Sequence, residues 1–264
     1  MTPPPALTAV LDHLARLRLQ GFAEHLERLY GEDPERALLA AATLAPLADH
    51  ELASRAQRTV QRRIQEARFI RIQTVDQFDF DYNPATRKIK TSYLKLLHAD
   101  PVSQCLGAVF VGNSGLGKTH LARALGYAAC QRLHSVLFLP CSTLLNRLTT
   151  AEATKDLERD IRRIQSPQLL LIDELAYLTM SHDEANLFFQ VISRRHDHNR
   201  PTVITTNKPF GEWNQVFHGD AIAHAIVDRL TEKAEIFYLE GKSYRQTHRQ
   251  GLQTVSHHHD APGT

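Results

Sequence analysis

The segment between residues 112 and 120 constrains the fold more than any other stretch of the chain. It reads, in order, Gly112, Asn113, Ser114, Gly115, Leu116, Gly117, Lys118, Thr119 and His120. This is the pattern G-x-x-x-x-G-K-T, with an apolar stretch of strand type before it and good helix formers after it. A strand, a glycine-rich loop and a helix start together place consecutive backbone N–H groups around a phosphate. All nine residues are therefore candidate nucleotide-binding residues.

Two side chains in this loop have defined roles in phosphate binding. Lys118 would reach the β- and γ-phosphates of a nucleoside triphosphate, and the Thr119 hydroxyl would be a ligand of Mg²⁺. The start of the following helix adds a partial positive charge. An accidental glycine turn before a helix is the alternative, but the lysine and threonine in register favour a nucleotide site.

The composition excludes several classes of protein. The chain has 264 residues, 42% of them hydrophobic, which suffices for one large domain or two smaller ones. Its net charge of +2 identifies no partner, and three cysteines without C-x-x-C spacing fit a reducing cytoplasm better than a disulfide scaffold. The N-terminus lacks the features of a signal peptide, and no apolar run is long enough to cross a bilayer. The sequence predicts a soluble cytoplasmic protein that does not associate with a membrane.

Hydrophobic periodicity divides the chain into four parts. Residues 1–73 predict a helical N-terminal domain for binding DNA or a partner, in which a third helix ends near Pro46 and a fourth follows it. Residues 74–95 alternate aromatic and acidic side chains and predict a linker whose aromatics pack on the next domain. Residues 96–248 alternate strand and helix patterns, and residues 249–264 predict a flexible tail with three histidines in a row.

Five strands are expected in the third part. They cover residues 108–111, 135–139, 168–172, 201–207 and 235–239. Helical patterns lie between successive strands, which implies a mostly parallel sheet with helices on both faces. The expected fold is α/β, a P-loop NTPase domain with a parallel five-stranded sheet, preceded by a small all-α N-terminal domain. Ligands of such sheets bind at the carboxyl ends of the strands.

Polar side chains end two of these strands. Asp173 and Glu174 follow an almost wholly apolar strand, where two carboxylates are costly without a compensating cation or partner. Asp173 would hold Mg²⁺, and Glu174 would be the base that polarises an attacking water. Asn207 ends the next strand and is expected beside Asp173, where its amide would orient water and contact the γ-phosphate. The alternatives are a helix N-cap with a first-turn acid for the carboxylates, and a turn residue for Asn207.

A predicted helix near residue 60 carries an excess of arginine. Its basic residues are Arg55, Arg58, Arg62, Arg63 and Arg68, and Glu66 is the only acid between Arg55 and Arg71. Such an excess fits contact with the phosphate backbone of DNA. A solvated helix face and an interface with an acidic partner are the alternatives.

In this order the motifs resemble those of the IstB-like ATPases, AAA+ transposition helpers of insertion sequences that are related to DnaC-type helicase loaders. The resemblance rests on the loop at 112–120, Leu171-Ile172-Asp173-Glu174, Thr205-Thr206-Asn207, Asp228-Arg229-Leu230 and Ser243-Tyr244-Arg245. It covers roughly residues 5–250 and also includes the leucine-rich and arginine-rich helices of the N-terminal part.

The resemblance implies an AAA+ ATPase that uses ATP and Mg²⁺, forms a homo-oligomer, binds and deforms duplex DNA, and delivers this target to a partner transposase. The nucleotide-site positions that it implies are Lys118, Thr119, Asp173, Glu174 and Asn207. Arg229 matches the arginine finger, which would act in trans on a neighbouring subunit, with an ion pair to an acid such as Asp228 as the alternative. Arg245 would have a second sensor or finger role at the nucleotide.

Two other functions stay open from the sequence. A replicative helicase loader of the DnaC type would have the same catalytic residues, but its N-terminal helices would bind a helicase. A binding adaptor would use nucleotide only to set its assembly state. An adjacent reading frame for an integrase-like transposase would favour the transposition helper.

Overall fold

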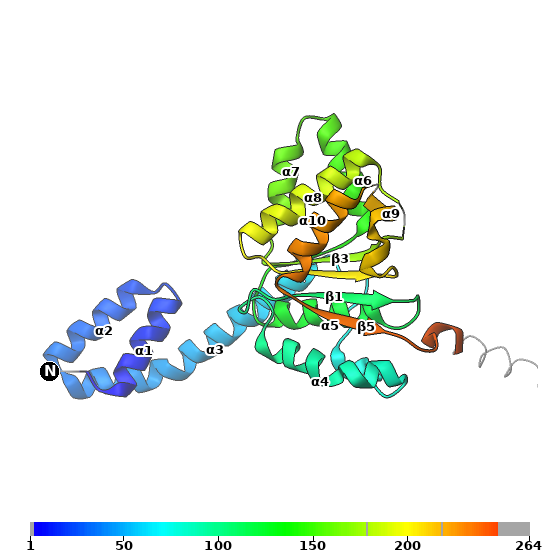
Figure 1. Ribbon diagram of the computed structural model, residues 1–264. Helices are drawn as coiled ribbons and strands as arrows, with labels where there is room; N and C mark the ends of the chain where they lie inside the picture. Colours follow the sequence, from blue (N-terminus) through cyan, green and yellow to red (C-terminus); the bar gives the residue numbers. More distant parts are fainter. Residues whose placement is uncertain (1–2, 178, 218, 248–264) are drawn as a thin grey trace, which may run out of the picture. The chain divides into compact units, whose positions relative to one another are not determined.

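The computed structural model describes residues 3–177, 179–217 and 219–247 (Figure 1). The chain divides into two compact units, residues 1–62 and residues 63–264. The predicted tail at 249–264, with its three histidines, lies outside the described residues. Within the described ranges, none of the helices combines the length and the apolar character that a bilayer span requires.

The first unit consists of helices packed on a small apolar core. Helix α1 spans Pro5–Arg16, α2 spans Gln20–Glu32, and α3 spans Pro34–Glu66, so α3 continues into the second unit. The core side chains recur at helical spacing and are Leu7, Val10, Leu14, Leu26, Ala37 and Ala41. The prediction of an all-helical region before the sheet is confirmed.

One helix boundary in this region was predicted wrongly. The sequence predicts a helix end near Pro46, but α3 runs through this proline without a break. A proline inside a helix loses one backbone hydrogen bond and costs about 3 kcal/mol. Ala41 and Ala48 are buried on either side of it, at 2% and 5% exposure, so packing favours one continuous helix over two.

The second unit is built on a five-stranded parallel sheet, as predicted. Its strands are β1 (Gly107–Gly112), β2 (Val136–Pro140), β3 (Leu169–Leu175), β4 (Thr202–Thr206) and β5 (Ala234–Leu239). The strand order is β2-β3-β4-β1-β5, and every neighbouring pair is parallel. Since β1, β4 and β3 are adjacent, the residues that follow their carboxyl ends meet at one edge of the sheet.

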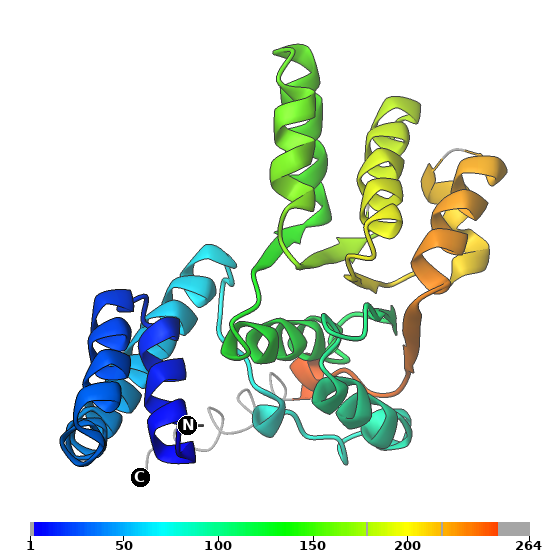
Figure 2. The same ribbon diagram turned by 90° about the vertical axis from the view of Figure 1, so that its left-hand side faces the viewer.

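Helices cover both faces of this sheet (Figures 1 and 2). Helices α4 (Pro84–Ala99) and α5 (Lys118–Gln131) lie on one face. The opposite face carries α6 (Cys141–Ala153), α7 (Leu157–Gln165), α8 (His182–Asp197), α9 (Trp213–Phe217) and α10 (Asp220–Thr231). Two short 3₁₀ helices complete the described elements of this unit, η1 (Val75–Gln77) and η2 (Phe210–Glu212). Strands β1 to β4 are almost entirely buried between the two helix layers, whereas Glu235, Ile236 and Tyr238 of β5 are exposed.

The boundary between the two compact units lies between residues 62 and 63, earlier in the chain than the boundary expected at residue 73. The segment at 74–95, which was expected to be a linker, belongs to the second unit. Phe80 is 6% exposed and Tyr93 is fully buried among the residues that pack on β1 and α5. The Ala67 carbonyl accepts a hydrogen bond from the Phe138 backbone N–H of β2, at 2.8 Å. Burial of Phe80 and Tyr93 joins the expected linker to the sheet, and the Ala67 hydrogen bond attaches the residues before it to the edge strand β2.

Arg195 of α8 fixes the loops that lead into two site-bearing strands. Arg195 is 1% exposed, and its guanidinium donates hydrogen bonds to the carbonyls of Gln165, Pro167 and Pro201, among others. Burial lowers the pKa of Arg195 to about 9. These bonds satisfy a buried cation and hold the starts of β3 and β4 together.

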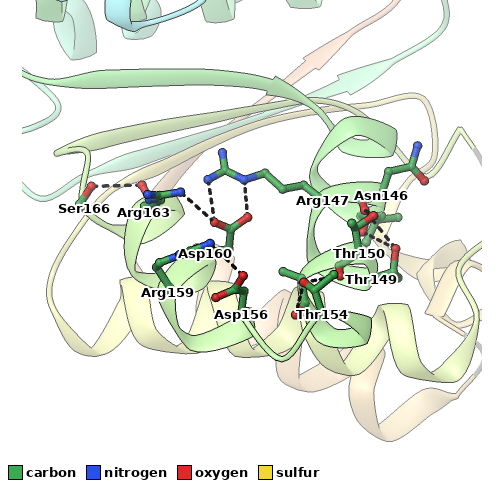
Figure 3. Close-up of polar contacts among 12 residues, drawn as sticks. Asn146, Arg147, Thr149, Thr150, Thr154, Asp156, Arg159, Asp160, Arg163 and Ser166 are labelled. Atoms are coloured by element: carbon green, nitrogen blue, oxygen red, sulfur yellow. Dashed lines mark hydrogen bonds and ion pairs between the residues drawn. The ribbon is translucent and has the colours of Figure 1, made fainter.

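Helices α6 and α7 form a pair linked by charged side chains (Figure 3). Arg147 of α6 donates from Nε to the Asp160 carboxylate of α7 at 2.9 Å, and Arg163 lies 3.5 Å from the same carboxylate. The hydrogen bond from Arg147 holds the pKa of Asp160 below its usual value. Arg147 and Arg163 are thus both engaged with the same acid of α7.

Candidate nucleotide-binding site

The glycine-rich loop lies between β1 and α5, where the motif predicts it. Gly117 has φ +89°, and an added Cβ would lie 2.4 Å from the Phe78 ring, so both backbone conformation and space require glycine. Helix α5 begins at Lys118, whose ammonium group donates to the Asn113 carbonyl at 2.8 Å. The loop therefore directs backbone N–H groups and the N-terminus of α5 towards one site.

A β-bulge brings the two carboxylates of β3 to the same edge. Ile172 pairs with Ile204 and Leu175 pairs with Thr206, so β3 has one more residue than β4 over this interval. Adjacent side chains of a regular strand point to opposite faces, and a bulge changes these directions. Glu174 has φ +60°, which is uncommon for a residue with a side chain and accompanies the bulge.

Thr205 of β4 connects the two residues of the bulge. Its hydroxyl donates to Asp173 Oδ1 at 2.6 Å and accepts a hydrogen bond from the Glu174 backbone N–H at 2.9 Å. Asp173 Oδ1 also accepts from the Thr119 hydroxyl at 2.8 Å. The predicted metal-binding pair, Thr119 and Asp173, is therefore in direct contact in the structure.

A cavity of about 610 Å³ collects most of the residues expected to bind nucleotide. From the loop it includes Ser114, Gly115, Leu116, Gly117, Lys118, Thr119 and His120, whereas Gly112 and Asn113 are not among its lining residues. It also includes Asp173, Glu174, Asn207 and Arg245. The structure thus brings together residues that four separate sequence motifs contribute.

The segment before α4 forms a wall of this cavity that the sequence analysis did not assign to it. The additional lining residues there include Ile70, Arg71, Gln73, Phe78, Tyr82 and Asn83. His120 Nε2 lies 2.8 Å from the Thr74 carbonyl, and its ring contacts the Phe78 ring at 5.3 Å between centroids. The alternating aromatic residues of this segment could have indicated that it lines the cavity, but the sequence analysis assigned them only to packing.

The cavity concentrates positive charge. Lys118 is half-buried, and its pKa is lowered mainly by burial and also by the nearby Arg245, while Asp173 opposes this shift. Arg123 of α5 lies 3.9 Å from Asp173 Oδ2, and burial likewise lowers its pKa. The sequence analysis did not assign Arg123 to the site because no motif includes it, although it lies five residues after Lys118 on the same helix. Cations held close together in this way favour a polyanionic ligand.

Arg229 lies outside this cavity. Its guanidinium stacks on the Phe189 ring at 4.8 Å from the centroid, and Nη1 donates to the Ala225 carbonyl at 3.2 Å. It is half-buried on α10 and is not among the residues that line the nucleotide cavity. Within one chain, the structure does not bring Arg229 to the predicted site.

The five arginines expected to bind DNA divide between the two units. Arg55, Arg58 and Arg62 belong to the first unit, and Arg63 and Arg68 belong to the second. Glu51 accepts hydrogen bonds from Arg55 at 2.7 Å and from Arg58 at 3.3 Å, and chiefly the Arg55 bond lowers the pKa of Glu51. Arg63 pairs with Glu66 at 3.2 Å. Part of the positive charge counted in the sequence is therefore compensated by acids one or two helical turns away.

The fold and the site define a class of protein. A parallel five-stranded sheet with a phosphate-binding loop after β1 and acidic residues at the end of β3 is a P-loop nucleotide-binding domain of the AAA+ type. Residues 12–251 match the family described as IstB-like ATP binding protein. The chain belongs to this family, and the resemblance noted in its sequence is confirmed.

Relatives from insertion sequences support the assignment over most of the chain. The predicted ATP-binding protein of insertion sequence IS21 from Pseudomonas aeruginosa is 33% identical over 88% of this chain and 86% of its own length. The predicted ATP-binding protein of IS232 from Bacillus thuringiensis subsp. berliner is 34% identical over 88% of this chain and 92% of its own length.

Solved structures share the fold. The DnaC helicase loader has a TM-score of 0.56 and 20% identity, covering 63% of this chain and 96% of its own. AMPPCP-bound DnaA from Aquifex aeolicus has a TM-score of 0.54 and 16% identity, covering 69% of this chain and 55% of its own. At these identities the likeness concerns the fold alone, which is the one predicted.

Proposed function

We propose that this protein is an ATPase that acts as a transposition helper for an insertion sequence. The single observation that carries the ATPase part is the contact of Thr119 and Asp173 beside Glu174, at the mouth of the phosphate-binding loop. A nucleotide-binding site needs no base next to its metal ligand, whereas hydrolysis does. Membership of a family of insertion-sequence ATP-binding proteins supports the biological context.

The residues present fit Mg²⁺ bound together with ATP. Thr119 and Asp173 offer hard oxygen ligands 2.8 Å apart. No group of three or more His, Cys, Asp or Glu side chains suited to a metal occurs among the residues that the structure describes. This suits Mg²⁺, which proteins hold through one or two carboxylates with the remaining ligands from phosphate and water. The ion would neutralise charge on the phosphate oxygens.

The side chains of this chain would divide the hydrolytic reaction between them. Lys118 would bind the β- and γ-phosphates, and Asn207 would orient a water molecule for attack on the γ-phosphorus. Glu174 is exposed to the cavity and would take the proton from this water as the bond to ADP breaks. The Thr205 hydroxyl would keep Glu174 and Asp173 in place through its two hydrogen bonds.

Arg229 would complete the site from a neighbouring subunit. It lies outside the cavity of its own chain, which is the arrangement a finger in trans requires. A guanidinium aimed at the γ-phosphate of another subunit stabilises transition-state charge and makes hydrolysis depend on assembly. ATP binding would in this way favour a homo-oligomer.

The oligomer would bind and deform duplex target DNA and deliver it to a partner transposase in the cytoplasm, and hydrolysis would drive release or remodelling. Bending a short duplex costs about 1–6 kcal/mol, which phosphate contacts from several subunits can offset. The candidates for these contacts in each subunit are Arg55, Arg58, Arg62, Arg63 and Arg68.

Electron microscopy of the protein with ATP and a long duplex tests this function directly. The expected result is ordered oligomers that follow and bend the DNA, and their loss in a Lys118→Ala variant. The fold shared with the DnaC helicase loader makes a DnaC-type loader the second candidate. Co-purification with a hexameric helicase, together with no affinity for duplex DNA, would favour that loader and reject the transposition helper.

A further inference from the structure

Residues 241–247, which follow β5, lie against the phosphate-binding loop. The Tyr244 backbone N–H donates to the Gly115 carbonyl at 3.0 Å. A Cβ added to Gly115 would lie 2.1 Å from Ser243 Oγ, so this side of the loop is covered by the Ser243 side chain. Arg245, two residues on, lines the nucleotide cavity. The placement of this segment therefore decides where the Arg245 guanidinium can reach.

Asn83 holds this segment through both functions of its amide. Its Nδ2 donates to the Lys242 carbonyl at 3.0 Å, and its Oδ1 accepts from the Lys242 backbone N–H at 3.0 Å. Asn83 is 4% exposed and lies 159 residues before Lys242. The amide thereby binds both backbone groups of one residue, as a neighbouring strand would.

Two further features fit this contact. Gly241 has φ +126°, and an added Cβ would lie 2.4 Å from Asn83 Oδ1, so the close approach needs glycine. The Tyr82 hydroxyl donates to Thr247 Oγ1 at 2.8 Å, and the Tyr82 ring packs edge-on against the Tyr244 ring. Adjacent residues 82 and 83 thus bind both ends of the segment.

We propose that Asn83 is a positioning residue for nucleotide binding, which holds residues 241–247 so that Arg245 faces the phosphate groups of ATP. This rests on the proposed ATP-binding function of the cavity. Gly241, Lys242, Tyr244 and Arg245 are all exposed, so apolar burial contributes little to the placement of this segment. Polar contacts to Asn83, Tyr82 and Gly115 therefore restrain its position.

A double-mutant cycle tests the proposal by equilibrium binding of ATP to Asn83→Ala, Arg245→Ala and the variant with both changes. Asn83→Ala is expected to weaken binding by about tenfold, the loss expected when one hydrogen bond to a charged group is disrupted. Because Asn83 acts through Arg245, the double variant should bind no more than about twofold more weakly than Arg245→Ala alone. Additive losses, or unchanged binding in Asn83→Ala, would overturn the proposal.

Controls separate positioning from a loss of folding. Asn214→Ala removes the same kind of side chain from an exposed position bonded to Asp220, and should leave ATP binding unchanged. If Asn83→Ala does not fold, Gly241→Ala disrupts the same contact from the other side and should weaken binding similarly. Lys118→Ala tests the cavity itself. If Lys118→Ala binds ATP as the wild type does, the proposed function is rejected. If Lys118→Ala does not bind ATP but Asn83→Ala binds it normally, only the role of Asn83 is rejected.

Discussion

The Thr205 hydroxyl lies 2.6 Å from Asp173 Oδ1 and also accepts a hydrogen bond from the Glu174 backbone N–H. One buried side chain thus binds both residues of the β3 bulge. Thr205 is 1% exposed and Asp173 is 6% exposed, so water does not readily replace either bond. The relative placement of the acidic pair depends on this hydroxyl.

Replacing Thr205 by valine should lower the rate of ATP hydrolysis by about tenfold or more. Valine keeps the shape of the side chain but removes a hydrogen bond to a charged group, worth about 1.5–3 kcal/mol. Steady-state kcat is the measurement, with ATP affinity measured in parallel. Thr205→Ser retains the hydroxyl and should preserve most of the activity. Equal losses in the valine and serine variants would show that packing, not the hydroxyl, is what matters.

Glu174→Gln should reduce hydrolysis by about 100-fold or more while ATP binding persists, because a general base contributes roughly 10²–10⁴-fold. Phosphate release and equilibrium binding are measured on the same preparation. Glu152→Gln, an exposed acid of α6, is the control and should behave as the wild type. A wild type that binds ATP without turnover would instead support the adaptor function.

Mixing Arg229→Ala with Glu174→Gln should recover part of the activity that each variant lacks alone. At some mixed interfaces an intact Arg229 faces an intact Glu174, which is possible only if the finger acts in trans. The measurement is hydrolysis as a function of mixing ratio. A mixture of Arg229→Ala with the double variant has no complete interface and should stay inactive. Mixed oligomers without recovery would contradict a finger in trans.

Changing Arg55, Arg58 and Arg62 together to alanine should weaken duplex binding and flatten its salt dependence. Removing one arginine–phosphate interaction reduces the slope of log K against log salt by about 0.9. Binding is measured at several salt concentrations in ATP. Changing Arg16, Arg28 and Arg36 removes the same charge from the same unit and serves as the control. Equal effects of the two triple variants would indicate general attraction, and no effect would assign the arginines to a partner interface.

Only one of the three cysteines should react with a thiol reagent in the folded protein at pH 8. Cys130 and Cys141 are buried, and burial raises the pKa of each thiol to about 12, whereas Cys105 is partly exposed. Mass spectrometry should find one label in buffer and three in denaturant. In the unfolded chain these thiols ionise near pH 9, whereas in the folded protein they ionise near pH 12. Because the unfolded state therefore loses its protons at lower pH, the free energy of unfolding should fall as the pH rises from 9 towards 12. Labelling of Cys130 or Cys141 in buffer would contradict the packing of α5 or α6.

Much of the fold and the core of the site was predictable because the deciding interactions are local. The phosphate-binding loop needs glycines, a lysine and a threonine at fixed spacing, and Asp173 follows a strand whose apolar sequence is itself a signal. The end of α3 was not predictable in this way. Pro46 normally ends a helix, and here packing on both sides of it offsets the cost.

The sequence by itself determined the order of strands and motifs along the chain, the phosphate-binding loop and the identity of the acidic and amide residues, since each depends on neighbours within a few positions. Only the tertiary structure decided which residues these motifs meet. The hydrogen bond of Thr205 to Asp173, the binding of Lys242 by Asn83, and the placement of Arg229 outside its own cavity all depend on how separate elements come together. Such arrangements depend on the sheet register, on the β-bulge and on the path of the chain after β5 back to the phosphate-binding loop, which periodicity and spacing do not encode.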